Sequence, residues 1–150
     1  MQSVSRQGVR AILLLLLGGA AISVSLKARC QLVDDGSTNI LDGVSTNLNV
    51  PVYVGSNAPF TMLVLTNGAT VTNIFGSLNI GYNAGANSNS VIMGGPGTVW
   101  TNFASRVGYN GSYNRLSILD GAVVAGRDLG LAENFSANNN LAVISGAGSL

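Results

Sequence analysis

Short apolar runs recur along the chain, each flanked by small polar residues and followed directly by a glycine-marked turn. The runs span residues 63–65, 91–93, 116–119 and 141–144. The turns contain Gly68, Gly95, Gly121 and Gly146, which lie 27, 26 and 25 residues apart. A fixed period of about 25 residues is typical of one supersecondary unit repeated in series. The pattern therefore predicts an array of β-units instead of a single globular core.

One unit of this pattern has room for three short strands. In the second unit the candidate strands are 77–82, 90–93 and 98–102, where Val, Ile, Leu and Thr alternate with small polar residues. Three short strands in about 25 residues make one coil of a parallel β-helix, whose strands pair with their counterparts one coil away at about 4.8 Å. We therefore predict an all-β, right-handed parallel β-helix, or β-solenoid, of about four coils.

An asparagine stands two residues before each of the last three apolar runs. These residues are Asn89, Asn114 and Asn139, at a constant spacing of 25. Asparagine in a turn adopts the left-handed conformation readily and hydrogen-bonds neighbouring backbone groups. The spacing predicts an internal asparagine ladder, and the alternative is that all three are solvated loop residues.

A second repeated element is an apolar residue followed by glycine, and alternate units match each other better than adjacent ones. The pairs begin at residues 54, 80, 107 and 129. Residues 94–100 resemble 145–150, and residues 67–71 resemble 120–124. The spacing between these matching segments predicts a higher-order repeat of two coils.

The first 30 residues differ from the rest of the chain. Arg6 and Arg10 precede the apolar stretch 11–26, and small and polar residues follow as far as Ala28 and Cys30. This order is typical of a secretory signal peptide, and it predicts a signal helix over 1–30 with cleavage near Ala28 to Cys30. Residues 31–50 are expected to form an N-terminal cap or a degenerate coil. Residues 51–150 are expected to form the β-helical repeats, truncated at the C-terminus inside a strand.

Composition excludes several classes of function. The chain contains no histidine and one cysteine, so a Ser-His-Asp hydrolase, a Cys-His protease and a His-ligated metal site are excluded. Residues 31–150 contain three cations and six anions, a net charge of −3. Because no basic stripe remains after the signal, nucleic acid is not an expected partner. The composition indicates no cofactor.

The carboxylates offer one candidate for catalysis, because glycan cleavage requires clustered acids. The candidate group comprises Asp120, Asp128 and Glu133, with Arg115 and Arg127 nearby in the sequence. Asp120, however, occupies the repeated turn in which Asn67 also stands, so turn chemistry accounts for it. We expect no catalytic residue.

The sequence also offers candidates for two kinds of binding site, one for calcium and one for sugars. The acids Asp34, Asp35 and Asp42 are a weak candidate for calcium, because the glycine-aspartate repeat of calcium-binding β-rolls is absent from the sequence. Tyr82, Tyr109 and Trp100 could stack on sugars or pack within the fold. The recurrence of the two tyrosines at equivalent places favours packing.

Three strings of residues carry a resemblance to a known family. They are Gly-Pro-Gly-Thr-Val-Trp-Thr-Asn at 95–102, the segment 107–122 beginning Val-Gly-Tyr-Asn, and Leu-Val-Leu-Thr-Asn-Gly-Ala-Thr-Val-Thr at 63–72. Together they resemble the repeat associated with type V secretion and PEP-CTERM proteins, an autotransporter-passenger-like β-solenoid. The resemblance covers roughly residues 45–150.

The resemblance implies a bacterial protein that is secreted or held at the cell surface, and it supplies no catalytic residues. The expected function is a β-solenoid repeat segment with a structural or adhesin-like role and without catalysis. The alternative is a remnant of a polysaccharide-active parallel β-helix enzyme. Expected partners are glycans, other surface proteins, further coils of the same protein or edge-paired copies.

Overall fold

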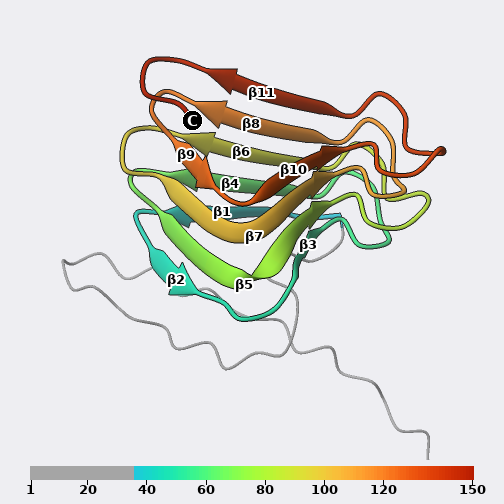
Figure 1. Ribbon diagram of the computed structural model, residues 1–150, viewed down its shortest axis with the longest axis horizontal. Helices are drawn as coiled ribbons and strands as arrows, with labels where there is room; N and C mark the ends of the chain where they lie inside the picture. The colour runs from blue at the N-terminus through green and yellow to red at the C-terminus, as the bar shows by residue number, and fades with distance from the viewer. Residues whose placement is uncertain (1–35) are drawn as a thin grey trace, which may run out of the picture.

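A computed structural model describes residues 36–150, which fold into parallel β-strands without a helix (Figure 1). The first apolar run predicted from the sequence lies in β4 and the second in β6. The strands are β1 (Thr38–Asp42), β2 (Ser45–Asn47), β3 (Val52–Val54), β4 (Met62–Thr66), β5 (Thr70–Ile80), β6 (Ser90–Gly94), β7 (Val99–Val107), β8 (Arg115–Leu119), β9 (Val123–Ala125), β10 (Asp128–Leu131) and β11 (Leu141–Ser145).

The strands form two stacked parallel sheets. One sheet has the order β1-β4-β6-β8-β11, and the other has the order β10-β7-β5-β2, with β3 also paired to β5 and β9 to β7. Each strand pairs with its counterpart one coil away, so that Leu63 lies beside Val91 and Val91 beside Leu116. This register confirms the β-solenoid predicted from the period.

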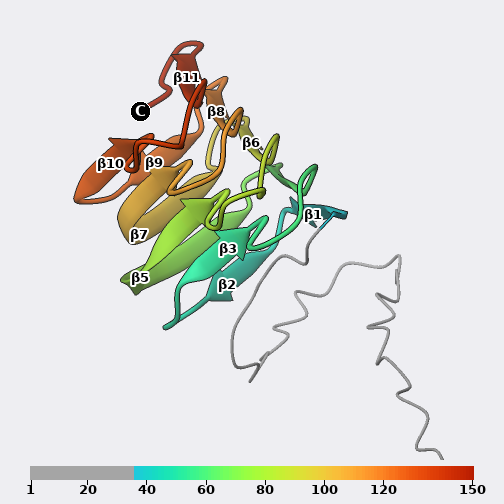
Figure 2. The same cartoon turned by 90° about the vertical axis from the view of Figure 1, so that its right-hand side faces the viewer.

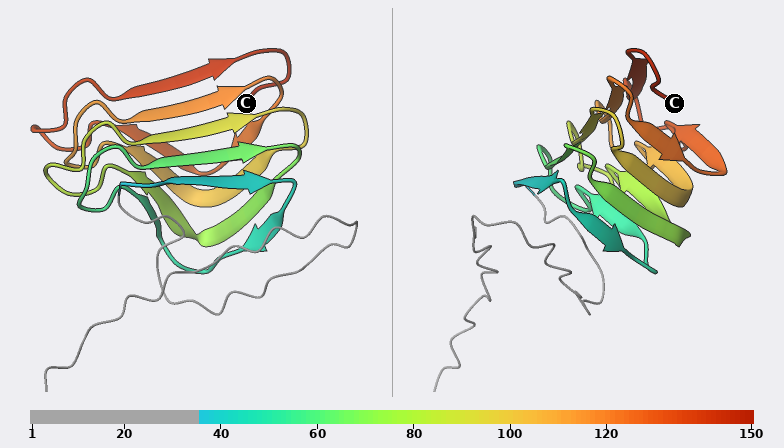
Figure 3. Two further views of the ribbon diagram at one scale, coloured as in Figure 1. Left: turned by 180° about the vertical axis from the view of Figure 1, so that it is seen from behind. Right: turned by 90° about the vertical axis from the view of Figure 1, so that its left-hand side faces the viewer.

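The described residues make four coils and the beginning of a fifth. The first coil contains β1 to β3, the second β4 and β5, the third β6 and β7, and the fourth β8 to β10, and β11 begins the fifth. In every coil a glycine turn joins the two sheets on one side, and a loop returns to the next coil on the opposite side (Figure 3). The three short strands predicted per coil are therefore present, but in the second and third coils two of them merge.

The merged strands β5 and β7 bend where the shorter pairs of the neighbouring coils are interrupted. Their register shifts between Asn73 and Ser77. Asn73 and Asn102 are paired neighbours at this bend, and both are buried. Asn73 Nδ2 donates to the Val50 carbonyl oxygen at 2.9 Å, and Asn102 Nδ2 donates to Ser105 Oγ at 2.8 Å. The bend is thus held by side-chain amides that bond to nearby backbone and hydroxyl oxygens.

The core runs along the axis between the sheets. Side chains alternate between buried and half-buried positions in β4 and β6, as expected for strands with one face toward a core. Apolar side chains stack on their counterparts, and Trp100, fully buried, lies between Val71 and Val124 in the second sheet. No coil could bury these side chains alone, because each core face is covered by the neighbouring coils.

The described part of the predicted cap, residues 36–50, lies within the first coil. β1 pairs with β4 and β2 pairs with β5 in the same parallel sense as the later coils. The predicted signal peptide 1–30 and the acids Asp34 and Asp35 lie outside the described residues. Among residues 36–150, no helix is long and apolar enough to cross a membrane.

Candidate functional site

The four glycines predicted to mark the turns all adopt the left-handed conformation. Their φ angles are 76° at Gly68, 90° at Gly95, 87° at Gly121 and 95° at Gly146. Residues other than glycine pay a steric cost in this region because their Cβ approaches the backbone. The left-handed backbone of the turns therefore explains why glycine recurs there. The four glycines do not, however, lie at equivalent positions of successive coils.

From the second coil to the fifth, the turns alternate between two forms, so that the repeat of two coils is a structural feature of this part. The first coil departs from it, because Asp42 and Ser45, which pair with Thr66 and Thr70, are joined by a turn one residue shorter than that of the second coil. In the second and fourth coils the turn is short and contains Gly68 or Gly121. In the third and fifth coils it is one residue longer, and a second glycine, Gly97 or Gly148, lies beside the glycine of the coil below.

A hydroxyl group closes each longer turn and connects it to the shorter turn below. Thr98 Oγ1 accepts from the Gly68 backbone N–H at 3.2 Å and donates to the Gly94 carbonyl oxygen at 2.9 Å. Ser149 Oγ makes the same two bonds in the fifth coil, with Gly121 N–H at 3.1 Å and the Ser145 oxygen at 2.7 Å. The longer turn thus fits on the shorter one through a specific pair of bonds.

The asparagine ladder exists, but its third member is Asn140 and not Asn139. Asn114 Oδ1 accepts from the backbone N–H of Asn89 at 2.9 Å and from its Nδ2 at 3.0 Å. Asn140 Oδ1 accepts from the same two groups of Asn114 at 2.8 and 3.1 Å. Asn89 Oδ1 in turn accepts from the Thr61 backbone N–H at 2.8 Å. Asn139 is exposed and has a φ of 56°.

The ladder also explains the glycine in the repeated pairs of an apolar residue and a glycine. A Cβ at Gly55, Gly81 or Gly108 would overlap the ladder asparagine of the next coil. The glycine of one coil and the asparagine of the next therefore form one packing unit. In the fourth coil Leu131 pairs with Val107, so the equivalent of Gly108 is Ala132, which also has a positive φ of 54°, and the predicted pair at 129–130 is wrong.

A second column of asparagines stands in the loops, two residues after this glycine or its equivalent. Asn83 Nδ2 donates to Asn57 Oδ1 at 2.8 Å, and Asn134 Nδ2 donates to Asn110 Oδ1 at 2.8 Å. In the sequence, this column is marked in part by the Tyr-Asn pairs at 82–83 and 109–110. The asparagine four residues before the ladder position in the two shorter loops, Asn57 before Thr61 and Asn110 before Asn114, is a sequence signal that could reveal this column.

The aromatic residues considered for sugar stacking are used for packing. Trp100 is in the core. Tyr82 and Tyr109 are half-buried and stack on each other, with ring centroids 5.0 Å apart and planes 12° apart, and Tyr53 meets Tyr82 edge-on at 4.9 Å. The faces of Tyr82 and Tyr109 that meet in this stack are therefore not open to a sugar.

The candidate carboxylates lie in separate settings. Asp120 is in the turn after β8, where its backbone N–H donates to the Ser145 carbonyl oxygen at 2.9 Å. Glu133 Oε1 is 3.1 Å from Arg106 Nε, and Asp128 Oδ2 is 3.8 Å from Arg127 Nε. Arg115 Nε bonds Ser117 Oγ at 2.8 Å. Within residues 36–150, no three acidic, histidine or cysteine side chains gather as metal ligands would.

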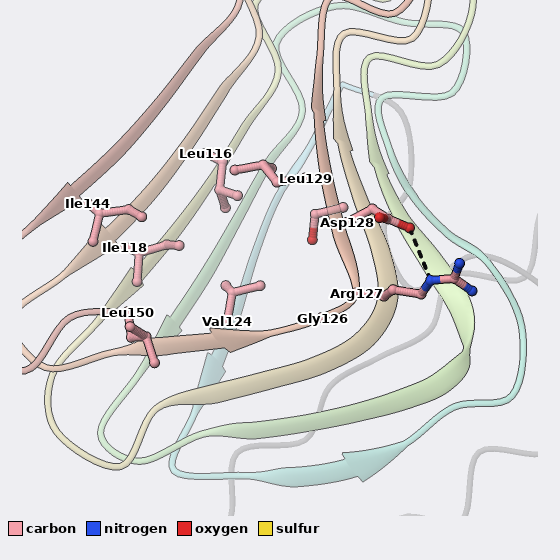
Figure 4. A pocket seen from close by; sticks show the side chains of 10 residues that line it. Leu116, Ile118, Val124, Gly126, Arg127, Asp128, Leu129, Ile144 and Leu150 are labelled. Carbon is pink, nitrogen blue, oxygen red and sulfur yellow. Dashed lines mark ion pairs between the residues drawn. The ribbon is translucent and has the colours of Figure 1, made fainter.

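The described residues enclose a hollow of about 250 Å³ at the open end of the last coils. Figure 4 shows Leu116, Ile118, Val124, Ile144 and Leu150 around it, while the Arg127 side chain points away. Leu116 and Ile118 belong to the solenoid core and Val124 packs against it, whereas Ile144 and Leu150 are more than half exposed. The hollow is therefore the continuation of the apolar core at the last described coil.

The comparisons with known proteins add nothing to the fold described above. No protein-family model, curated protein or solved structure matches the chain. The assignment to the β-solenoid architecture rests on the parallel register of the two sheets and on the ladders that connect successive coils.

Proposed function

We propose that this chain is an exported β-solenoid repeat segment of a bacterial surface protein, with a structural or adhesin-like role and without catalysis. The observation that carries the proposal is the use of the recurring residues. The turn glycines, the ladder asparagines and the tyrosines all serve contacts between one coil and the next. Such residues build a rigid rod whose sides are available for contacts.

Two further observations support the role over that of a polysaccharide-cleaving enzyme. The three candidate carboxylates occupy a turn, the start of β10 and an ion pair with Arg106. Hydrolysis of a glycosidic bond needs two carboxyl groups that face each other across the bond. The resemblance to type V secretion repeats and the signal-like pattern of residues 1–30 support the exported location.

Export is tested by producing the full chain in a Gram-negative bacterium and separating cytoplasm, periplasm, outer membrane and medium. Mass spectrometry of the N-terminus is expected to show a product that begins near residues 29–31. The matched control is Leu14→Arg with Leu15→Arg, which interrupts the apolar stretch and is expected to leave an uncleaved chain in the cytoplasm. An uncleaved wild-type chain found only in the cytoplasm would overturn the proposal.

The absence of catalysis is tested separately on the same exported protein. Incubation with a panel of plant, algal and bacterial polysaccharides is expected to release no new reducing ends. Release that disappears in Asp120→Asn, Asp128→Asn or Glu133→Gln would instead identify the chain as an enzyme.

A further inference from the structure

One column of loop residues is not used for packing. It consists of Phe60, Ser88, Tyr113 and Asn139, one residue from each of the four coils, directly before the ladder position, and it is called the loop column here. Figure 2 shows the loop side on which it lies. Backbone bonds fix its alignment: Phe60 N–H donates to the Asn87 oxygen at 3.1 Å, Ser88 N–H to Ser112 at 3.0 Å and Tyr113 N–H to Asn138 at 2.9 Å.

The loop column alternates between aromatic and polar side chains. Phe60 in the first coil is 72% exposed and Tyr113 in the third coil is 62% exposed. Ser88 and Asn139 stand in the second and fourth coils, and within residues 36–150 their side chains make no hydrogen bond. A ring, a hydroxyl, a second ring and an amide thus follow one another along the solenoid axis.

The backbone of the loop column is held in the left-handed region at every coil. The φ angles are 63° for Phe60, 57° for Ser88, 59° for Tyr113 and 56° for Asn139. Bulky residues rarely adopt this conformation, and such outliers gather at functional sites. Asparagine or glycine would fit more easily, so the two aromatic residues are retained at a conformational cost that packing does not explain.

The spacing of the two rings follows from the fold. Successive coils rise by about 4.8 Å, so residues two coils apart are separated by about 9.6 Å along the axis. In an extended β-1,4-linked polysaccharide each saccharide advances by close to one coil, and alternate saccharides present the same face. Such a chain, lying along the axis, would place equivalent faces over Phe60 and Tyr113.

We propose that the loop column binds a neutral, extended β-1,4-linked polysaccharide parallel to the solenoid axis. The two rings stack under alternate saccharides, and the Ser88 hydroxyl and the Asn139 amide hydrogen-bond the saccharides between and beyond them. The proposal deepens the adhesin-like role and rests on it. Each chain contributes two rings, so firm attachment comes from many weak contacts along repeated coils.

The chemistry of the column favours a glycan over other extended polymers. Its four side chains carry no charge, whereas binding of nucleic acid depends on cations that neutralise phosphates. A proline-rich peptide repeats every three residues, or about 9.3 Å, which is also close to the ring spacing. Recognition of such peptides uses a continuous aromatic-lined groove, and in this column Ser88 separates the two rings.

The test uses the full exported chain and soluble oligosaccharides. Isothermal titration calorimetry with cellohexaose and chitohexaose is expected to show weak binding to at least one of them. Maltohexaose, which is α-1,4-linked and coiled, is expected to bind at least tenfold more weakly. Phe60→Asn and Tyr113→Asn are each expected to weaken binding at least fivefold, and the double variant is expected to abolish it. Asparagine is chosen because Asn139 already occupies this column with the same backbone conformation.

Phe135→Asn is the matched control, because Phe135 is fully exposed, at 108%, and lies in a loop but outside the column. Its binding is expected to equal that of the wild type. Circular dichroism verifies that all variants keep their strand content. The proposal is overturned if the double variant binds as the wild type does, if Phe135→Asn weakens binding equally, or if maltohexaose binds as well as the β-linked chains.

Failure of this proposal and failure of the proposed function give different results. An exported and cleaved chain that binds neither β-1,4-linked oligosaccharide overturns the glycan site and leaves the structural role intact. Binding of a proline-rich peptide through Phe60 and Tyr113, without glycan binding, also overturns it. A chain that stays uncleaved in the cytoplasm overturns the proposed function itself.

Discussion

Single asparagine side chains connect successive coils of this chain. Asn114 connects three coils: it accepts from Asn89 through its Oδ1 and donates to Asn140 through its Nδ2 and its backbone N–H. Asn89 and Asn114 are fully buried, and buried polar groups are costly unless they are paired. The ladder therefore both satisfies the loop backbone and fixes which coil lies next to which.

The ladder predicts that loss of a ladder asparagine lowers the free energy of unfolding much more than loss of an asparagine beside the ladder. Asn114→Ala leaves the Asn89 backbone N–H and the Asn89 Nδ2 without their acceptor, and each buried group left unpaired costs about 1–3 kcal/mol. Asn139→Gly, outside the ladder and at a positive φ, is expected to leave the free energy of unfolding nearly unchanged. Urea unfolding followed by circular dichroism measures both. Equal stability of the two variants would contradict the role of the ladder.

The displaced third member of the ladder shows where sequence spacing is insufficient. The last apolar run begins with Leu141, but this residue pairs with Arg115 and is exposed. The inward residue equivalent to Leu116 is Ala142. Counting back from the first apolar residue therefore leads to Asn139, one residue too early. Burial, which decides the register, cannot be read from the apolar character of a single residue.

Two other features, the loop column and the position of Ala132, could not be predicted from the sequence. Their residue type is not the same in every coil, so no repeated pattern marks them. The loop column contains a different residue in every coil, and only the backbone conformation is shared. Ala132 stands where Gly55, Gly81 and Gly108 stand in the earlier coils and still adopts a positive φ. The period, the turn glycines and the pairing of coils could be predicted, because there the same steric requirement selects the same residue each time.

At the scale of the element, the glycine turns determine how neighbouring coils fit together. From the second coil to the fifth, short and long turns alternate, and the hydroxyl groups of Thr98 and Ser149 occupy equivalent places in the long ones. Thr98 is fully buried. Its hydroxyl supplies a donor and an acceptor at a point where the extra turn residue interrupts the regular ladder of backbone bonds. The sheet strands on either side therefore keep their register.

Removal of this hydroxyl is expected to destabilise the turn. Thr98→Val keeps the shape of the side chain but leaves the Gly68 N–H and the Gly94 carbonyl oxygen unpaired, with an expected loss of about 1–3 kcal/mol. Thr101→Val is the matched control, since Thr101 lies three residues further on, in β7, is half-buried and makes no side-chain hydrogen bond within residues 36–150. Thermal unfolding by calorimetry compares them. A control that falls in stability as far as Thr98→Val would refute the assignment.

At the scale of the whole molecule, stability is the sum of coil interiors and the contacts between neighbours. The central coils are covered on both sides, whereas β1 and β11 each have one strand partner within the described residues. Apolar side chains are exposed at both ends of the array: Ile40 and Val44 in the first coil, and Leu129, Leu141 and Ile144 in the last strands. The coils in the middle of the array are therefore expected to be the most stable, and those toward its described ends the least stable.

Hydrogen exchange measures this gradient directly. Amides of β6 and β7 are expected to exchange slowest, because opening them requires the loss of two interfaces between coils. Amides of β1 and β11 are expected to exchange at least tenfold faster under the same conditions, since one interface suffices. Uniform protection from β1 to β11 would show that the chain unfolds as one cooperative unit and not as a linear array.

The alternation of long and short turns has a consequence for how such a rod changes its length. Loss or gain of a single coil would bring two long turns or two short turns into contact, and the hydroxyl of Thr98 or Ser149 would then face the wrong partner. Loss or gain of two coils together, within the second to fifth coils, would leave each junction of a long turn with a short turn as it is. If recombination between repeats changes the length of the rod, we therefore expect it to add or remove two coils at a time, each change being about 9.6 Å along the axis.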